Sequence, residues 1–289
     1  MNIKIRPMKQ EDVEICGHIC YEAFKNLADR HNFRPDFPSP EFAVQIAQSF
    51  QAKPQIYSII AENEDGEIVG SNYLWEYDAI RAVGPLSVDP QKQSKGAGRK
   101  LMDAVIERGA GSEGIRLVQD SFNIASMSLY TSLGFDVKEP LVLIEGVIKG
   151  EVAAGIEVRL LHEEDTEQCA TLCRRIHGIE RTNELTNTPA FLTSFVAVRD
   201  GQITAYASAP HFWAMNYAVA ETEEDMHALL TGAGNLSNGQ PISFLLPTRQ
   251  TTLFRWCLKQ GMRVIKPSTL MSMGKYEEPR GCFLPSVGY

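Results

Sequence analysis

The chain has 289 residues, of which 44% are hydrophobic and 22% charged, and this is the composition of an ordinary globular protein. At ~150 residues per domain, the length predicts two domains. The formal net charge of −8 argues against general nucleic-acid binding, because an acidic surface repels phosphate backbones. No apolar stretch reaches the ~18 residues of a membrane-spanning helix, and the N-terminus shows no signal-peptide core. We therefore expect a cytoplasmic protein with neither nucleic acid nor membrane as a partner.

The six cysteines lack the close CxxC pairs of zinc or redox sites. Cys16 and Cys20, like Cys169 and Cys173, are spaced four residues apart within helical patterns. A free thiol on the inner face of a helix behaves as a small buried hydrophobe. The histidines show no metal-binding spacing either. We therefore predict core packing for the cysteines and no metal site.

The first predicted strand and helix recur in the second half of the chain. An alternating strand at 3–6, an acidic helix start and a helix with two cysteines return in the same order from residue 156. Hairpins with Asp-Gly turns at 65–66 and 200–201 follow in both halves. Near each end, a helix stopped by glycine precedes a strand. The sequence therefore indicates two copies of one unit.

Each copy is predicted to be one αβ unit, built from both strands and helices. The two copies are joined around Gly150 to Gly155. We therefore expect one domain over residues 1–150 and a second over residues 151–289.

Residues 83–101 predict an apolar strand, a turn and a glycine-rich loop that opens a helix. A helix start presents free backbone N–H groups and a partial positive charge, so it can bind a pyrophosphate. Gly96 and Gly98 would let the backbone approach such a ligand closely. Lys95 and Arg99 add positive charge to a chain that is acidic elsewhere.

The wider pattern carries more weight than a short Gly-x-Gly. Gln93-x-x-Gly96-x-Gly98, preceded by Leu86-x-Val88-x-Pro90, resembles the acetyl-coenzyme A loop of the GNAT N-acetyltransferase superfamily. The resemblance implies that the strand meets the pantetheine arm through backbone groups and that the loop amides hold the pyrophosphate.

A second element of that family follows at the matching distance. Asn123-x-x-Ser126, then Leu129-Tyr130 and Gly134-Phe135, resembles the family's helix after the fifth strand. The resemblance implies that Asn123 bonds the pantetheine and that Tyr130 lies near the thioester sulfur, where a phenol can act as an acid. It covers nearly all of residues 1–145, and it implies an α/β (α+β) fold in which each copy is a twisted, mixed and mainly antiparallel sheet flanked by helices. The cofactor-binding residues implied in this way are Leu86, Ser87, Val88, Gln93, Ser94, Lys95, Gly96, Ala97, Gly98, Arg99, Asn123 and Tyr130.

The second copy keeps the scaffold and loses these residues. In place of the glycine loop it has Ala218–Asp225, with four carboxylates and no glycine, and these charges would repel a pyrophosphate. Tyr130 aligns with Cys257, and Asn123 falls near Gln250. We therefore expect a degenerate GNAT-like domain without a cofactor site.

The resemblance implies an N-acetyltransferase that transfers acetyl from acetyl-CoA to a primary amine of a small molecule, by direct attack in a ternary complex. The Val88 backbone N–H is the expected oxyanion donor, and Tyr130 is the expected acid. Glu76 is the first candidate for the base, although it could also be an ordinary exposed turn carboxylate without a role, and an ordered water chain is the alternative base. The aromatic, proline-rich segment 29–38 is the expected acceptor wall, in which His31 is either a ligand contact or a solvated loop residue.

Several alternatives stay open at this point. The apolar C-terminal segment 279–289 is expected to pack back on the body, to lie between the copies, or to bring the Tyr289 carboxylate to the active site. The second copy would shape the acceptor pocket or contact a homodimer partner. A sensor that binds acetyl-CoA without turnover is the alternative function, since it would keep the same loop. A Rossmann domain is excluded, because the loop follows the fourth strand and lacks G-x-G-x-x-G.

Overall fold

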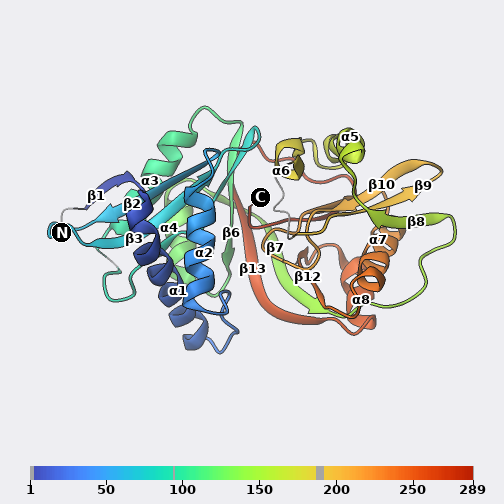
Figure 1. Cartoon of the computed structure of the whole chain (residues 1–289), viewed down its shortest axis with the longest axis horizontal. Coiled ribbons are helices and arrows are strands. Elements are labelled where there is room, and N and C mark those ends of the chain that lie inside the picture. Colours follow the sequence, from blue (N-terminus) through green and yellow to red (C-terminus); the bar gives the residue numbers. More distant parts are fainter. Residues whose placement is uncertain (1–2, 94, 187–191, 289) are drawn as a thin grey trace. The chain divides into compact units, whose positions relative to one another are not determined.

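The computed structural model describes residues 3–93, 95–186 and 192–288. Its contacts divide the chain into two compact units, shown in Figure 1 with colours that follow the sequence. Unit 1 comprises Met1–Leu117 and Phe122–Phe135, and unit 2 comprises Val118–Ser121 and Asp136–Tyr289. Within the described ranges, no helix has the length and apolar character needed to cross a membrane.

Unit 1 contains a mainly antiparallel sheet in the order β1-β2-β3-β4-β6, with β5 paired to β3. The end of β6 is counted with unit 2. The strands are β1 Lys4–Pro7, β2 Ile56–Glu62, β3 Ile68–Trp75, β4 Ile80–Val83, β5 Ser87–Val88 and β6 Gly114–Asp120. The helices are α1 Val13–Arg30, α2 Pro40–Gln51, α3 Ala97–Gly109 and α4 Ile124–Ser132.

Helices cover both faces of this sheet. Successive residues of β3 point to opposite faces. The Asn72 amide donates to the Leu101 carbonyl of α3 at 3.4 Å, whereas the Tyr73 ring packs edge-on against Phe50 of α2. Helices α1 and α2 contact each other and lie side by side in Figure 1. The sheet therefore lies between α1 and α2 on one face and α3 on the other.

In unit 1, the strands next to the predicted site, β4, β5 and β6, do not form one continuous ladder. β4 runs parallel to β6 only from Ile80–Ala82 to Gly114–Arg116. β5 pairs instead with β3, where Ser87 lies opposite Ser71. Among the described residues of unit 1, no strand pairs with the outer edge of β5. That edge therefore has backbone groups that no neighbouring strand pairs with.

Unit 2 contains a five-stranded antiparallel sheet in the order β14-β11-β10-β9-β8, and a second group of strands in the order β13-β7-β12. Helices α5 and α7 both contact β10. The strands are β7 Asp136–Gly146, β8 Ile156–Leu160, β9 Phe195–Arg199, β10 Gln202–Ala207, β11 Ala218–Ala220, β12 Ile242–Pro247, β13 Arg263–Gly274 and β14 Cys282–Leu284. The helices are α5 Thr166–His177, α6 Thr182–Thr186, α7 Glu223–Leu236 and α8 Thr251–Lys259.

The last strand of the first repeat belongs to unit 2. β7 pairs on one edge with β12 and on the other with β13, both of which come from the second repeat. Ile144 of β7 shares a buried core with Phe244 of β12. Ser121, directly after β6, donates from its backbone N–H to the Pro267 carbonyl of β13 at 3.2 Å. The compact units therefore differ from the expected division at residue 150, because strand pairing places β7 among strands of the other repeat.

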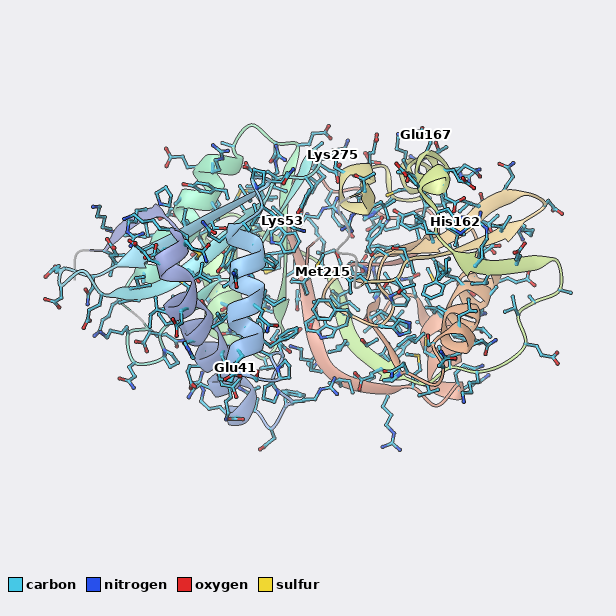
Figure 2. All side chains as sticks on the ribbon, viewed as in Figure 1. Glu41, Lys53, His162, Glu167, Met215 and Lys275 are labelled. Atoms are coloured by element: carbon cyan, nitrogen blue, oxygen red, sulfur yellow. The ribbon has the colours of Figure 1, made fainter. Side chains whose placement is uncertain are left out.

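Both repeats begin with the same ion pair. Arg6 donates to both carboxylate oxygens of Asp12, at 2.6 and 2.9 Å. Arg159 does the same with Asp165, at 2.6 and 2.8 Å. The Asp165 carboxylate also accepts the backbone N–H of His162, which Figure 2 labels. The hydrogen bonds from the arginines hold the pKa of each aspartate below its usual value. The two repeats therefore share this side-chain contact as well as their sequence pattern.

Candidate functional site

Helix α3 begins directly after the glycine loop. Its N-cap residue, Gly96, has a φ of +90°, at which a side chain would be strained, and makes no side-chain cap. The Gly96 carbonyl accepts the Lys100 N–H at 3.1 Å and so starts the helical ladder. The N–H groups of Ala97, Gly98 and Arg99 have no acceptor within the helix, and the first turn contains no acidic residue. The start of α3 can therefore bind an anion.

Basic side chains surround this helix start. Arg99 donates to the Ser132 hydroxyl of α4 at 2.6 Å, a neutral acceptor that leaves its charge in place. Lys95 is exposed in the loop. Lys92 pairs with Glu67 at 2.6 Å, so part of its charge is balanced. The predicted positive charge is therefore present, carried mainly by Lys95 and Arg99.

Strand β5 turns polar backbone groups toward its open edge. The Asp89 N–H donates to the Val69 carbonyl at 2.9 Å. In an antiparallel pair hydrogen-bonded and non-hydrogen-bonded positions alternate, so Val88, opposite Gly70, directs its N–H and C=O away from β3. Its carbonyl accepts the Gln93 side-chain amide at 3.2 Å. Gln93 therefore ties the loop to the strand, and the Val88 N–H faces the same edge.

The start of α3 lies against both β5 and α4. A β-carbon at Gly98 would meet the side chains of Val88 and Leu129 at 3.7 Å, which is ordinary contact. A larger group would therefore project from this point without a clash at its first atom. Ala97 is buried beneath the loop. The three elements that carry the predicted cofactor residues thus meet in unit 1.

Three further members of the predicted set lie on or near β5 and in the loop after it. Ser87 is buried, and its hydroxyl lies 3.2 Å from that of Ser71, so only its backbone is available to a ligand. Leu86 directly precedes β5 and is partly buried. Ser94 lies outside the described residues.

Helix α4 carries Asn123 and Tyr130. Asn123 is the N-cap, and its side-chain oxygen accepts the Ser126 N–H at 3.2 Å. Tyr130 is 8% exposed. Burial raises the pKa of Tyr130 to about 12, while a hydrogen bond with the Ser126 side chain acts in the opposite direction. The phenol therefore keeps its proton throughout the neutral range.

The structure does not bring Glu76 to this group. Glu76 follows β3, and its carboxylate accepts two hydrogen bonds from Arg108, at 3.1 and 3.0 Å. Arg108 lies at the end of α3, ~16 Å along the helix from its start at a rise of ~1.5 Å per residue. A carboxylate engaged by an arginine at that distance is poorly placed to accept a proton near Val88. We therefore assign no base role to Glu76.

The expected acceptor wall is anchored next to Asn123. Phe33 stacks on Phe122 with ring centroids 4.4 Å apart, and the His31 ring lies 5.0 Å from Phe122. His31 also hydrogen-bonds through Nδ1 to the Leu27 carbonyl at 2.9 Å, and so helps to close α1. Phe122 was not among the predicted site residues, although its position directly before Asn123 is a signal that could have identified it.

The corresponding helix start in unit 2 is closed by its own side chains. The connection from β11 to α7 is only Glu221 and Thr222, compared with residues 89–96 in unit 1. Thr222 caps α7 by accepting the Asp225 N–H at 3.1 Å. The Asp225 carboxylate is fully buried and accepts from Thr204 at 2.7 Å and from Arg199 at 3.1 Å. An anion would meet a capped helix and a buried negative charge here.

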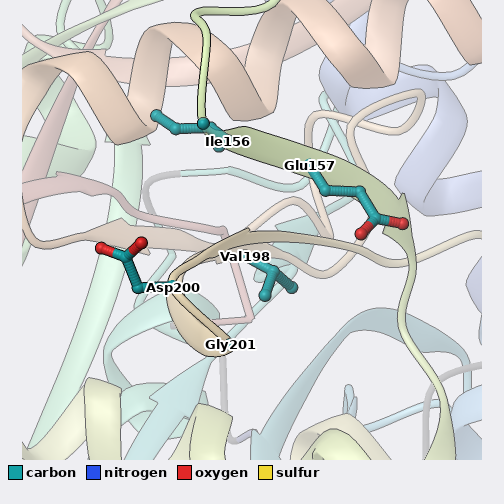
Figure 3. A pocket seen from close by; sticks show the side chains of 6 residues that line it. Ile156, Glu157, Val198, Asp200 and Gly201 are labelled. Atoms are coloured by element: carbon teal, nitrogen blue, oxygen red, sulfur yellow. The ribbon is translucent and has the colours of Figure 1, made fainter.

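Apart from the site in unit 1, there is an open hollow in unit 2. It is lined by Gly155, Ile156, Glu157, Val198, Asp200 and Gly201. Figure 3 shows Glu157 on β8 and Asp200 at the turn between β9 and β10.

All six cysteines are buried free thiols, as expected. In the ranges that the structure describes, no three His, Cys, Asp or Glu residues form a group that could hold a metal ion.

Comparisons with known proteins give one family match and several structures of similar fold. Residues 13–135 match the model of the acetyltransferase (GNAT) family. No curated protein matches the chain. A protein from Pyrococcus horikoshii is 16% identical, with 96% of this chain and 91% of that chain covered and a TM-score of 0.72.

Two further solved structures are similar over 96% of this chain. One is a GCN5-related N-acetyltransferase from Sphaerobacter thermophilus, with 14% identity, 96% of that chain covered and a TM-score of 0.62. The other is a tandem GNAT protein from the clavulanic acid biosynthesis pathway, with 13% identity, 100% of that chain covered and a TM-score of 0.58. At these identities the likeness shows the fold alone.

Proposed function

Because residues 13–135 form a domain of the acetyltransferase (GNAT) family, we propose that unit 1 is an N-acetyltransferase that uses acetyl-CoA. The acetyl group would pass to a primary amine of a small molecule, by direct attack in a ternary complex. The observation that carries this proposal is the uncapped start of α3 against the open edge of β5.

The helix start fits the diphosphate of acetyl-CoA. The N–H groups of Ala97, Gly98 and Arg99 point out of the helix without a side-chain cap, and Arg99 and Lys95 add charge of the right sign. Gly98 leaves room where a side chain would project. Bound acetyl-CoA would supply an acetyl group activated as a thioester.

The edge of β5 and the cap of α4 fit the arm that follows the diphosphate. The outward N–H of Val88 would donate to a carbonyl oxygen, and a donor fixed in a strand needs no reorganisation when charge develops there. Asn123 uses its side-chain oxygen on the helix, which leaves its N–H₂ group to donate to the arm.

Tyr130 would donate a hydrogen bond to the departing sulfur. An ordinary thiol has a pKa of ~8.5, below the value of about 12 for this phenol, so full proton transfer from Tyr130 is unfavourable. A shared proton still stabilises developing negative charge on sulfur. The tyrosine therefore acts mainly as a hydrogen-bond donor.

The acceptor would enter beside the stacked rings of Phe33 and Phe122, next to Asn123. The attacking amine must be neutral, and with Glu76 held by Arg108 we propose that ordered water removes its proton. The net charge of −8 favours amines that arrive as cations.

For unit 2 we propose a degenerate copy that binds no cofactor. Its roles in shaping the acceptor pocket or in a homodimer contact stay predictions. Six buried free thiols support a reducing, cytoplasmic location.

The test is thiol release from acetyl-CoA in the presence of a panel of primary amines, with acetyl-CoA affinity measured by calorimetry on the same sample. Release with at least one amine, lost in Gly98→Glu, would support the proposal. Tight binding of acetyl-CoA with no release above background for any amine would favour the sensor.

A further inference from the structure

The C-terminal strand β14 is attached to unit 2 as a separate piece of chain. After β13 ends at Gly274, residues 275–279 are irregular, and Lys275 and Glu278 are exposed. Lys275 is labelled in Figure 2. The strand itself is almost fully buried, with Phe283 2% exposed. A short irregular linker therefore precedes β14, and β14 is not joined by a hairpin to β11, the strand with which it pairs.

β14 is held along both of its edges. Its register with β11 places Phe283 opposite Val219, between the pairs that Cys282 and Leu284 form. The Phe283 N–H and carbonyl point to the other side, where they bond to the Gln250 side chain at 3.1 and 2.5 Å. This follows the alternation of an antiparallel pair, in which neighbouring residues bond to opposite sides. One edge therefore binds β11, and the other edge binds a single side-chain amide.

Gln250 is free to act as this clamp because it does not cap its own helix. It occupies the N-cap position of α8 and makes no side-chain bond to the helix backbone. Its N–H₂ group donates to the Phe283 carbonyl, and its side-chain oxygen accepts the Phe283 N–H, so both bonds go to one residue of β14. A side-chain amide reproduces in this way the pairing that a neighbouring strand would offer.

Contacts outside β14 fix its direction. The Arg280 N–H donates to the Ile176 carbonyl of α5 at 2.7 Å, and the Phe283 ring lies 4.7 Å from the ring of His177. A side chain at Gly281 would come within 2.6 Å of the Ala220 carbonyl, so the chain passes close to β11 there. Ser286 accepts from Arg181 at 3.2 Å. The groove thus recognises a backbone, one aromatic ring and one hydroxyl.

We propose that the cleft beside β11 is a binding groove for an extended peptide with an aromatic residue at the position of Phe283, and that β14 is its built-in occupant. Strand addition of this kind takes its affinity from main-chain hydrogen bonds and its specificity from alternate side chains. All of these contacts lie within unit 2, so the groove does not depend on acetyl transfer by unit 1.

Unit 1 offers the same two backbone and side-chain positions. Val88 and Asn123 stand at the places that Ala220 and Gln250 take in unit 2, at the outer edge of a strand and at the cap of the following helix. If the proposed function holds, the pantetheine arm and β14 use equivalent groups. This parallel, unlike the groove itself, rests on that function.

The test begins from the folded, full-length chain with a protease recognition sequence inserted between Glu278 and Pro279. After cleavage, the released segment should stay bound in size-exclusion chromatography and exchange with a fluorescent synthetic peptide of residues 279–289. A segment that cannot be exchanged, or a chain that aggregates on cleavage, would show that β14 is a core strand and would overturn the proposal.

The clamp is tested in the same cleaved protein. Gln250→Ala removes two hydrogen bonds to Phe283 and should raise the dissociation constant of the peptide about tenfold or more. Gln240→Ala changes an exposed glutamine of unit 2 and should leave it within about twofold. Equal affinity in the two variants would contradict the assigned groove. Thiol release by unit 1 should be the same in both.

Discussion

The starts of α3 and α7 show how one scaffold can present opposite binding properties. In unit 1, residues 89–96 separate β5 from a helix that begins without a side-chain cap or an acidic first turn. In unit 2, Glu221 and Thr222 alone connect β11 to α7. Thr222 caps the helix, and three acidic residues follow it. The helix dipole is the same in both cases. The two helix starts differ in whether a side chain of the protein already caps the free N–H groups and places negative charge beside them.

The strand edges beside these helices differ in the same way. Unit 1 leaves the outer edge of β5 without a paired strand in the described chain, whereas unit 2 covers the edge of β11 with β14. The fold therefore supplies an equivalent helix start and strand edge in each unit, and loop length, capping and edge pairing decide what each of them binds.

The largest expected effect comes from giving the helix start of unit 1 a negative charge like that in unit 2. Gly98→Glu should weaken acetyl-CoA binding more than about 100-fold, because the carboxylate would project where the diphosphate is expected. Calorimetry measures this directly. Gly111→Glu adds the same charge beyond the other end of α3, where a β-carbon meets no atom, and should have little effect. Similar affinity in the two variants would break the comparison.

A second prediction concerns the buried acid of unit 2. Asp225→Ala should lower the free energy of unfolding by about 3 kcal/mol, because Thr204 and Arg199 lose their shared acceptor. Denaturant unfolding gives the value, and Glu224→Ala, an exposed neighbour, is the control at less than about 0.5 kcal/mol. Acetyl-CoA affinity should stay the same in both, and a change in affinity would show that unit 2 takes part in binding.

The tyrosine that unit 2 replaces with Cys257 gives a smaller effect. Tyr130→Phe should lower kcat about tenfold and leave the dissociation constant of acetyl-CoA within about twofold. Since burial raises the pKa of Tyr130 to about 12, the phenol stays protonated as pH rises to 10, and kcat should not fall with a pKa near 10. Tyr57→Phe, in β2, serves as the control. Equal losses in kcat and affinity would remove the proposed role.

The smallest effect concerns what the two repeats share. The pKa values of Asp12 and Asp165 are lowered by their arginines, so this stability is present above pH ~4 and is lost as pH falls through the folded-state pKa. Asp12→Asn and Asp165→Asn should each lower the free energy of unfolding at pH 7 by about 1 kcal/mol and flatten its decline in acid. An unchanged acid limb in either variant would show that its ion pair contributes nothing.

Local patterns predicted much of the fold and of the candidate site. The glycine loop opening a helix, the hairpins and the two cysteine-bearing helices depend on neighbours in sequence, and each is present. The positive φ at Gly96 and the cap by Asn123 are also local features, but they were not among the predictions. Glu76 illustrates the limit, because its partner Arg108 comes from a distant helix that the sequence does not pair with it.

Pairing between distant strands could not be predicted for a similar reason. The alternation in β7 indicates a strand but not its neighbours, and these turned out to be β12 and β13. Gln250 looked only like a poor match to Asn123, since nothing in the sequence linked it to Phe283. Composition correctly indicated that the C-terminal segment packs on the body, but the edge it covers follows from register. Tyr289 itself lies outside the described residues.

The placement of β7 has a consequence for how this protein can be divided. A gene fragment that stops at residue 150 would encode the whole candidate site, yet it would strip β7 of both hydrogen-bonded neighbours. Bare strand edges of that length invite association with other chains. The last strand of the first repeat therefore depends on strands of the second repeat for its hydrogen bonds, and a truncation at residue 150 would remove those partners.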